Sequence, residues 1–162
     1  MKKTDLAYIA GIVDGEGCID ITRSRNKNTT DSLGSRIQVV MTEEYIPKWL
    51  QLSFGGSVNK YKPRTPNRQP SYAWQANGRT AITFLNAILP YLIIKRPQAE
   101  IVIRLEALKP RYGFRSSPME KFLQEIEARK LKNTRGRDLI APKIESLTSP
   151  KSEEPEKPVE PV

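Results

Sequence analysis

The strongest constraint on the fold is the segment of residues 6–17, where an apolar stretch runs directly into an acidic, glycine-rich turn. Wound as a helix, the apolar stretch presents large apolar side chains around most of its circumference, so we expect it to be buried all round. Its remaining side carries only the small residues Ala7, Ala10 and Gly11. A glycine in the interior of a helix lowers the stability of the helix by about 1 kcal/mol, so its presence needs a reason. We expect that reason to be close packing of this small side against another helix.

Two carboxylates, Asp14 and Glu16, follow where this helix is expected to end. The chain holds no second copy of the run, so an equivalent helix would have to come from a second chain. A two-fold interface would bring two Glu16 side chains together, and such a pair needs a proton or a divalent cation between its members. The sequence therefore favours a homodimer with an acidic centre over the plain alternative, a buried N-terminal helix followed by a turn.

Residues 9–17, with the sequence IAGIVDGEG, resemble the LAGLIDADG motif of homing endonucleases position for position. Val for Ile, Gly for Ala and Glu for Asp are substitutions that the family itself uses. Because there is one motif, the chain is similar to the homodimeric branch, and the order of its expected elements follows the family over residues 4–133. The resemblance implies that Glu16 binds a catalytic divalent cation, Mg²⁺ or another, helped by the carbonyl of Gly15. It also implies a structural role for Asp14.

Lys95 is the second candidate for a catalytic role. It follows the apolar run of residues 92–94, and a lysine held by such a run could stabilise charge on a phosphate. The family has a basic residue before a Gln-Ala helix, and Lys95 matches it because Gln98 and Ala99 follow. The alternative is one member of an exposed Lys-Arg pair.

One position departs from the family. Some homodimeric members have a glutamine that organises active-site water at the end of the second strand. Here Met41 stands at that position, and a thioether cannot do the same work. Gln38 or Thr42 would substitute only if the strand register differed.

Composition indicates a polyanionic partner. The chain of 162 residues has a net charge of +9, and residues 1–140 hold 24 Lys and Arg against 13 Asp and Glu. The sequence has no histidine, which excludes Ser-His, Cys-His and His-metal chemistry, and its single cysteine, Cys18, excludes an internal disulfide. Catalysis would rest on carboxylates, lysine and a hard cation. We expect no secretion signal and no membrane span, and hence an intracellular protein.

The pattern of apolar and polar residues predicts an α+β domain over residues 1–140, followed by a disordered Pro/Glu/Lys-rich tail over residues 141–162. Two antiparallel hairpins are expected from alternating strands at 18–25 and 36–41 and at 57–62 and 71–77, with residues 26–35 as a polar connection. The expected helices are residues 6–13, 49–54, 79–89, 97–108 and 119–132. In the family this order gives a LAGLIDADG-type sheet that is backed by helices and lies on DNA.

The strand residues that point away from the core would form the surface that meets double-stranded DNA, since a two-stranded ribbon fits the major groove. The candidates for contacts to base edges are Thr22, Arg36, Gln38, Asn59, Tyr61 and Gln75. Three basic residues in the second hairpin connection are expected to meet phosphates: Lys62, Arg64 and Arg68.

The sequence as a whole predicts a homodimeric, metal-dependent homing endonuclease that cuts both DNA strands at a long, pseudo-palindromic site. The first alternative is a non-enzymatic binder on the same scaffold, either an intron-RNA maturase or a DNA-binding regulator. The second is a basic scaffold that binds polyanions without sequence preference.

Overall fold

A computed structural model of the chain describes residues 1–26, 29–63, 65–110 and 116–134. One antiparallel sheet has the strand order β1-β2-β4-β3. Its strands are β1 (Gly17–Asn26), β2 (Thr29–Met41), β3 (Ser57–Tyr61) and β4 (Ser71–Asn77). The helices are α1 (Lys3–Glu16), α2 (Tyr45–Phe54), α3 (Gly78–Ile88), α4 (Arg96–Ala107) and α5 (Pro118–Asn133), with a short 3-10 turn at Leu89–Tyr91. The predicted α+β fold with two hairpins is confirmed.

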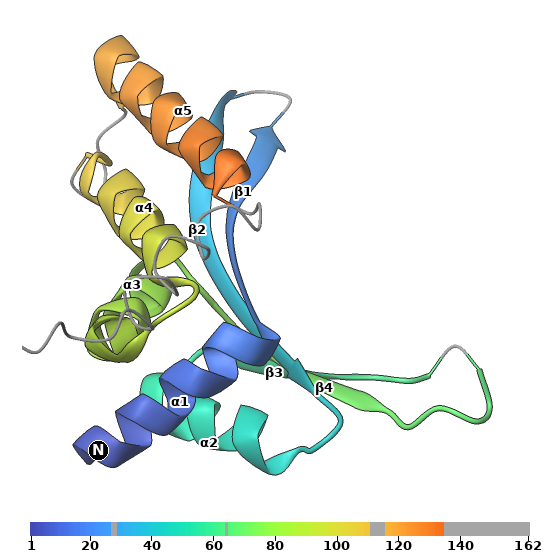
Figure 1. Cartoon of the computed structure of the whole chain (residues 1–162). Coiled ribbons are helices and arrows are strands. Elements are labelled where there is room, and N and C mark those ends of the chain that lie inside the picture. Colours follow the sequence, from blue (N-terminus) through green and yellow to red (C-terminus); the bar gives the residue numbers. More distant parts are fainter. Residues whose placement is uncertain (27–28, 64, 111–115, 135–162) are drawn as a thin grey trace, which may run out of the picture.

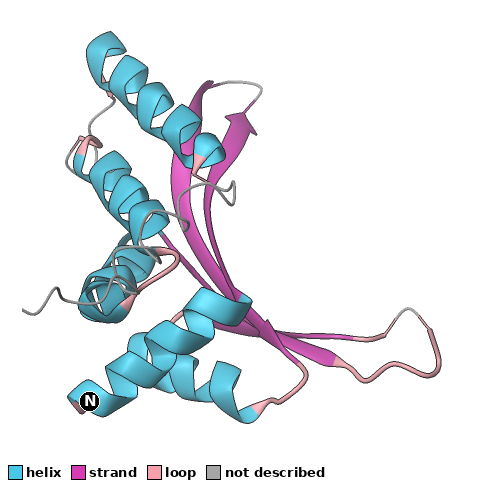
Figure 2. Cartoon of the chain, in the orientation of Figure 1, coloured by secondary structure: helices cyan, strands magenta, loops and turns pink. Residues whose placement is uncertain are grey.

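The helices gather on one side of a curved sheet, and the other face of the sheet carries none of them (Figure 1). The hairpin β1–β2 runs alongside α4 and α5, whereas the connecting end of the hairpin β3–β4 extends away from the helices (Figure 2). We call the side of the sheet without helices the uncovered face. None of the helices in the described ranges is long and apolar enough to cross a membrane.

Alternation along β2 decides which side chains reach the helices. Ile37 and Val39 are fully buried, whereas Arg36 and Gln38 between them remain partly exposed. Ile37 pairs with Ile19 of β1 and Val39 with Trp74 of β4, so apolar residues from three strands share the helical side.

The core lies between the sheet and the helices, around two large aromatic side chains. Trp74 and Phe84 are fully buried, with ring centroids 4.7 Å apart. The indole nitrogen of Trp74 donates a hydrogen bond of 2.8 Å to the carbonyl of Gly55, which satisfies its one polar atom. This packing joins α2 and α3 to the middle of the sheet.

β2 is longer than the sequence predicted, because it begins at Thr29 and includes most of the expected connection of residues 26–35. Leu33 and Ser35 keep the alternation and are buried. Gly34 lies inside the strand, where a Cβ would come within 2.9 Å of the Thr22 hydroxyl oxygen. The glycine therefore allows a close approach between strands and does not mark a turn.

α1 is not buried all round, contrary to the prediction. Ala7, Tyr8 and Gly11 are exposed on one side of the helix. Ala10 is fully buried among the chain's own core residues, so its side chain cannot contribute to an interface with a second helix. The open small side of α1 consists of Ala7 and Gly11.

α5 contacts the rest of the domain through the buried Leu131 and through several polar groups. Glu127 is almost fully buried and is paired with Arg104 of α4 and with Lys130. Glu125 forms an ion pair of 2.7 Å with Arg23 of β1. The predicted domain end at residue 140 and the predicted tail lie outside the described residues.

Candidate nucleic-acid interface and metal site

Glu16 is the last residue of α1, and its side chain is exposed. The chain turns from this helix straight into β1 at Gly17. A Cβ on Gly17 would lie 2.6 Å from the carbonyl oxygen of Val13, so glycine is needed for the helix to pass directly into the strand. This junction fixes a carboxylate where the helix meets the sheet.

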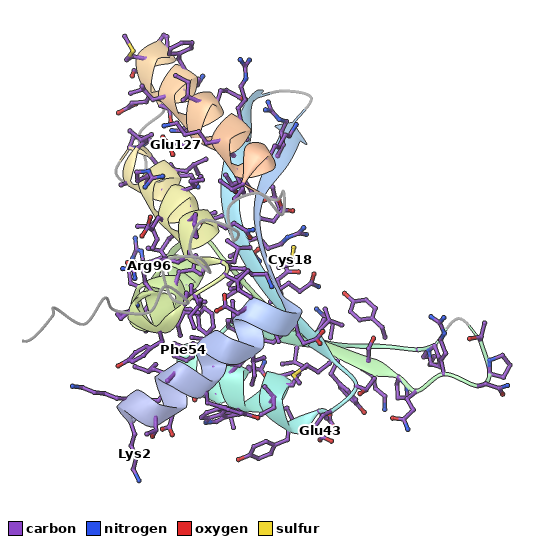
Figure 3. All side chains as sticks on the ribbon, viewed as in Figure 1. Lys2, Cys18, Glu43, Phe54, Arg96 and Glu127 are labelled. Carbon is purple, nitrogen blue, oxygen red and sulfur yellow. The ribbon has the colours of Figure 1, made fainter. Side chains whose placement is uncertain are left out.

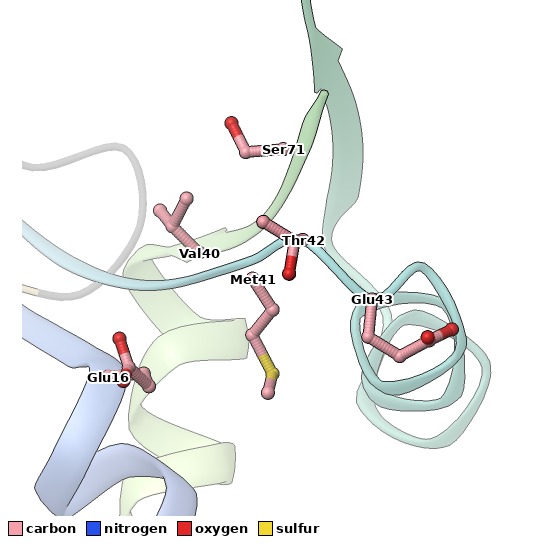
Figure 4. A pocket seen from close by; sticks show the side chains of 6 residues that line it. All are labelled: Glu16, Val40, Met41, Thr42, Glu43 and Ser71. Atoms are coloured by element: carbon pink, nitrogen blue, oxygen red, sulfur yellow. The ribbon is translucent and has the colours of Figure 1, made fainter. Parts of the chain in front are cut away.

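An open pocket of about 350 Å³ adjoins Glu16. Its lining residues are Glu16, Val40, Met41, Thr42, Glu43 and Ser71. Figure 4 shows the Glu16 carboxylate on one side of the pocket and the Met41 side chain and Thr42 hydroxyl across from it. The pocket therefore contains the carboxylate of Glu16, which the motif indicated, and that of Glu43, which was not among the predicted site residues.

The strand register places Met41 at the end of β2, as the sequence predicted, where it pairs with Tyr72. Gln38 comes earlier in β2 than Met41, pairs with Cys18 of β1 and does not line the pocket. Of the two alternatives for the water-organising residue, only Thr42 lies beside Glu16.

Asp14 binds the segment that leads into α4. Its carboxylate accepts hydrogen bonds from the backbone N–H groups of Ile93, Ile94 and Lys95, at 2.8, 3.2 and 2.8 Å. These contacts occupy both carboxylate oxygens and connect residues 80 positions apart in the chain. Asp14 therefore has the structural role that the resemblance implied.

Lys95 also binds the end of α1. Its ammonium group donates hydrogen bonds to the backbone carbonyls of Val13 at 2.8 Å and Asp14 at 2.6 Å. Burial lowers the pKa of Lys95, and the charge of Asp14 only partly offsets this effect. Lys95 is therefore not an exposed surface lysine. The apolar run that precedes it does not enclose it, because Ile93 and Ile94 are 63% and 48% exposed.

Within the described ranges, no three His, Cys, Asp or Glu side chains come close enough to form a metal site. Asp14 is committed to backbone N–H groups, so the carboxylates that a single chain offers at this place are those of Glu16 and, across the pocket, Glu43. Gly15 lies beside it in the last turn of α1 and is exposed. A site built from two Glu16 carboxylates would need a second chain.

The register brings the predicted base-contacting residues onto one surface. Gln38 pairs with Gln75, and the same alternation places Thr22 and Arg36 on the uncovered face. Asn59 and Tyr61 follow on β3, at alternate positions from Ser57, which pairs with Gln75. Cys18 projects from the uncovered face as well (Figure 3) and is a free, exposed thiol.

Two polar pairs are already formed on the uncovered face. Arg36 and Asp20 form an ion pair of 2.9 Å across β1 and β2. The Gln75 amide donates to the Asn77 side-chain oxygen at 3.2 Å on β4. Asp20 was not among the residues predicted to contact DNA on this face.

The residues expected to meet phosphates lie in the connection between β3 and β4. Lys62 and Arg68 are exposed there. Arg64 lies outside the described residues.

Three solved structures share this fold. I-CvuI in complex with the I-CreI target is 24% identical, with a TM-score of 0.68 over 82% of each chain. The archaeal intron-encoded I-Vdi141I in complex with DNA is 15% identical, with a TM-score of 0.69 over 85% of this chain and 87% of that one. I-TnaI is 18% identical, with a TM-score of 0.56 over 88% and 97% of the two chains. All three are homing endonucleases.

A comparison with curated proteins finds no match. The family model for LAGLIDADG endonucleases matches residues 9–95, which is more than half of the chain and runs from the motif helix to Lys95. The chain belongs to the LAGLIDADG endonuclease family.

Proposed function

We propose that this protein is a site-specific DNA endonuclease that works as a homodimer with Mg²⁺ and cuts both strands of a long, pseudo-palindromic site. The observation that carries the proposal is the position of Glu16. This carboxylate is exposed at the junction of α1 and the sheet, beside a helix side that is open for a second chain. Catalysis and dimerisation are thereby assigned to the same helix, α1.

The homodimer rests on the open side of α1. A Cβ on Gly11 or Gly15 would meet no other atom within 4 Å, so the chain itself does not require glycine at either position. Tyr8, which is 57% exposed, supplies apolar surface beside this small side. A second copy packed here would cover that surface and bring two Glu16 side chains together.

The donor set suits Mg²⁺, which binds oxygen ligands and commonly uses only one or two protein carboxylates together with substrate phosphates. We assign the cation to Glu16 from both chains, with the Gly15 carbonyl as a further oxygen donor. When bound, a divalent cation supplies charge stabilisation at the phosphodiester. Lys95 holds the last turn of α1 in place through the Val13 and Asp14 carbonyls and adds positive charge next to Glu16.

The uncovered face is the surface we assign to double-stranded DNA. It carries amide and guanidinium groups on adjacent strands, which are the groups that recognise base edges in the major groove. The exposed Lys62 and Arg68 extend positive charge beyond the sheet toward the phosphates. The use of this fold with DNA in I-CvuI and I-Vdi141I supports the same use here.

A second candidate is a protein that binds nucleic acid without cutting it, as a maturase or a regulator. The observation in its favour is Met41, which lies in the Glu16 pocket where a water-organising side chain is expected. This candidate shares the dimer and the uncovered face with the first and differs only at the chemical step.

Selection from a randomised duplex library, followed by cleavage of a plasmid that carries the enriched site, tests the proposal. We expect enrichment of one near-palindromic site and conversion of the plasmid to the linear form with Mg²⁺ but not with EDTA. Enrichment without cleavage at any divalent cation tested would support the non-cutting binder. Binding without enrichment of any sequence would overturn both and leave a nonspecific polyanion scaffold.

A further inference from the structure

Asp20 and Arg36 form a polar unit on the uncovered face. They are directly opposed across β1 and β2, and Oδ2 of Asp20 lies 2.9 Å from Nη2 of Arg36. The other carboxylate oxygen, Oδ1, accepts the backbone N–H of Ile21 at 2.8 Å, so the carboxylate is itself held in place. The side chains of Arg36 and Asp20 are 32% and 25% exposed, which leaves the unit accessible from the face.

The guanidinium of Arg36 is oriented by its contact with Asp20. Its Nε is buried and has no hydrogen-bond partner among the described residues, while Nη2 is bound to Asp20. An arginine has five N–H donors, so the contact with Asp20 leaves further N–H groups of the guanidinium for a ligand. A fork of two outer N–H groups is the arrangement that binds the O6 and N7 atoms of guanine.

The carboxylate of Asp20 is electrostatically unfavourable on a surface that meets DNA, because it repels phosphates. Its contact with Arg36 supplies a reason for its presence. A free arginine side chain has several rotatable bonds, and holding it in one orientation before binding removes part of the entropy loss of forming a bidentate contact. A held arginine also discriminates better between bases than one that can reach several acceptors.

We propose that Asp20 is a specificity-determining residue that positions Arg36 to bind one guanine in each half of the DNA site. The proposal rests on the proposed function, since it requires sequence-specific DNA binding through the uncovered face. It assigns to Asp20 a role that is exerted through Arg36 and not through direct contact with a base. Direct acceptance of a hydrogen bond from cytosine N4 is the competing role for a carboxylate.

The test compares Asp20→Asn, Arg36→Lys and the double variant by site selection at fixed salt, with affinities measured for the enriched site and its single-base changes. Glu125→Gln is the matched control. It removes the same charge from another Arg-carboxylate pair, the 2.7 Å contact between Arg23 and Glu125, which lies on the helical side of the sheet. Thermal melting of each variant checks folding, and Asp20→Ser replaces Asp20→Asn if the latter does not fold.

We expect Asp20→Asn to reduce the preference for guanine at one symmetric position about tenfold, within the range of a good bidentate contact. Arg36→Lys should lose the same preference, and the double variant should lose no more than Arg36→Lys alone. Affinity for random duplex should not fall in Asp20→Asn, because a negative charge has been removed. Glu125→Gln should keep the wild-type profile.

An unchanged guanine preference in Asp20→Asn would overturn the inference. A double variant that loses a further cytosine preference would overturn it as well, because Asp20 would then contact a base directly. If the wild-type protein enriches no sequence, the proposed function fails and not merely the role of Asp20.

Discussion

Asp14 and Lys95 connect the end of α1 to the start of α4 through contacts that run in both directions. The Asp14 carboxylate accepts the N–H groups of residues 93–95, and the Lys95 ammonium binds the carbonyls of Val13 and Asp14. Carbonyls at the end of a helix lack intrahelical donors, and a cation there also meets the favourable end of the helix dipole. The position of Glu16 thus depends on two residues that need not touch DNA.

Replacing Lys95 with methionine tests this connection. Lys95→Met keeps the length of the side chain but removes both donors, so we expect the protein to fold with about 1 kcal/mol less stability. Cleavage should fall at least tenfold, because Glu16 loses both its support and the neighbouring charge.

The measurements are melting temperature and the initial rate of plasmid cleavage. Lys48→Met, which breaks a surface pair between Lys48 and Glu44 in α2, is the control and should change neither. Normal cleavage by Lys95→Met would contradict a role for this lysine in the site.

At the scale of single residues, the family resemblance predicted Glu16 and Lys95 as site residues, because their sequence context is specific. It could not identify the orientation of α1, since apolar residues surround the helix and no polar stripe marks the solvent side. For that reason Ala10 was assigned to the interface although it lies in the core. Asp20 and Glu43 were missed because an acidic residue on an exposed strand or at a helix start has many ordinary explanations.

At the scale of elements, alternation and helical periodicity predicted the strands and helices in their order. The first half of β2 was the exception, because its polar residues and Gly34 are typical of a turn and were predicted as a connection. Only the neighbouring strand shows that Gly34 makes room for Thr22. The pairing of β2 with β4 joins the two hairpins into one sheet. The pattern of apolar and polar residues does not specify this pairing either.

α5 offers a prediction about pH. Burial opposes ionisation of Glu127, but hydrogen bonds from Lys130 and Arg104 outweigh it and lower the pKa of this carboxyl below its ordinary value of 4.5. A carboxyl whose pKa is lower in the folded state stabilises the fold above its unfolded value. That contribution disappears as the pH falls below 4.5 and through the lower folded value.

We therefore expect Glu127→Gln to lower stability by about 1 kcal/mol at pH 7 and to show a smaller difference from the wild type in more acidic buffer. Urea unfolding curves at pH 7 and pH 4 measure this. Glu120→Gln in the same helix changes an exposed capping contact and serves as the control. A difference that grows on acidification would show that the pKa of Glu127 is raised.

At the scale of the whole molecule, the open side of α1 should determine the oligomeric state. Gly11→Leu adds a large side chain where the single chain has free space and replaces a poor helix former, so the fold of each chain should be kept. A partner helix that packs closely at Gly11 would be forced away, and the dimer should dissociate into a less soluble monomer.

Analytical ultracentrifugation of Gly11→Leu and the wild type at equal concentration checks this. Ser53→Leu, which adds the same side chain to an exposed position on α2, is the control and should remain dimeric. If Gly11→Leu sediments as a dimer and binds DNA normally, the interface lies elsewhere.

In the proposed function, the exposed carboxylate at the end of α1 serves the cutting of DNA and not its binding. Cleavage and binding of the selected site by Glu16→Gln, which keeps the shape of the side chain but removes the charge that a divalent cation requires, measure the two steps separately. We predict that binding persists or strengthens, because carboxylate repulsion in the dimer is relieved, while cleavage with Mg²⁺ falls by orders of magnitude. Cleavage by Glu16→Gln at the wild-type rate would contradict the claim.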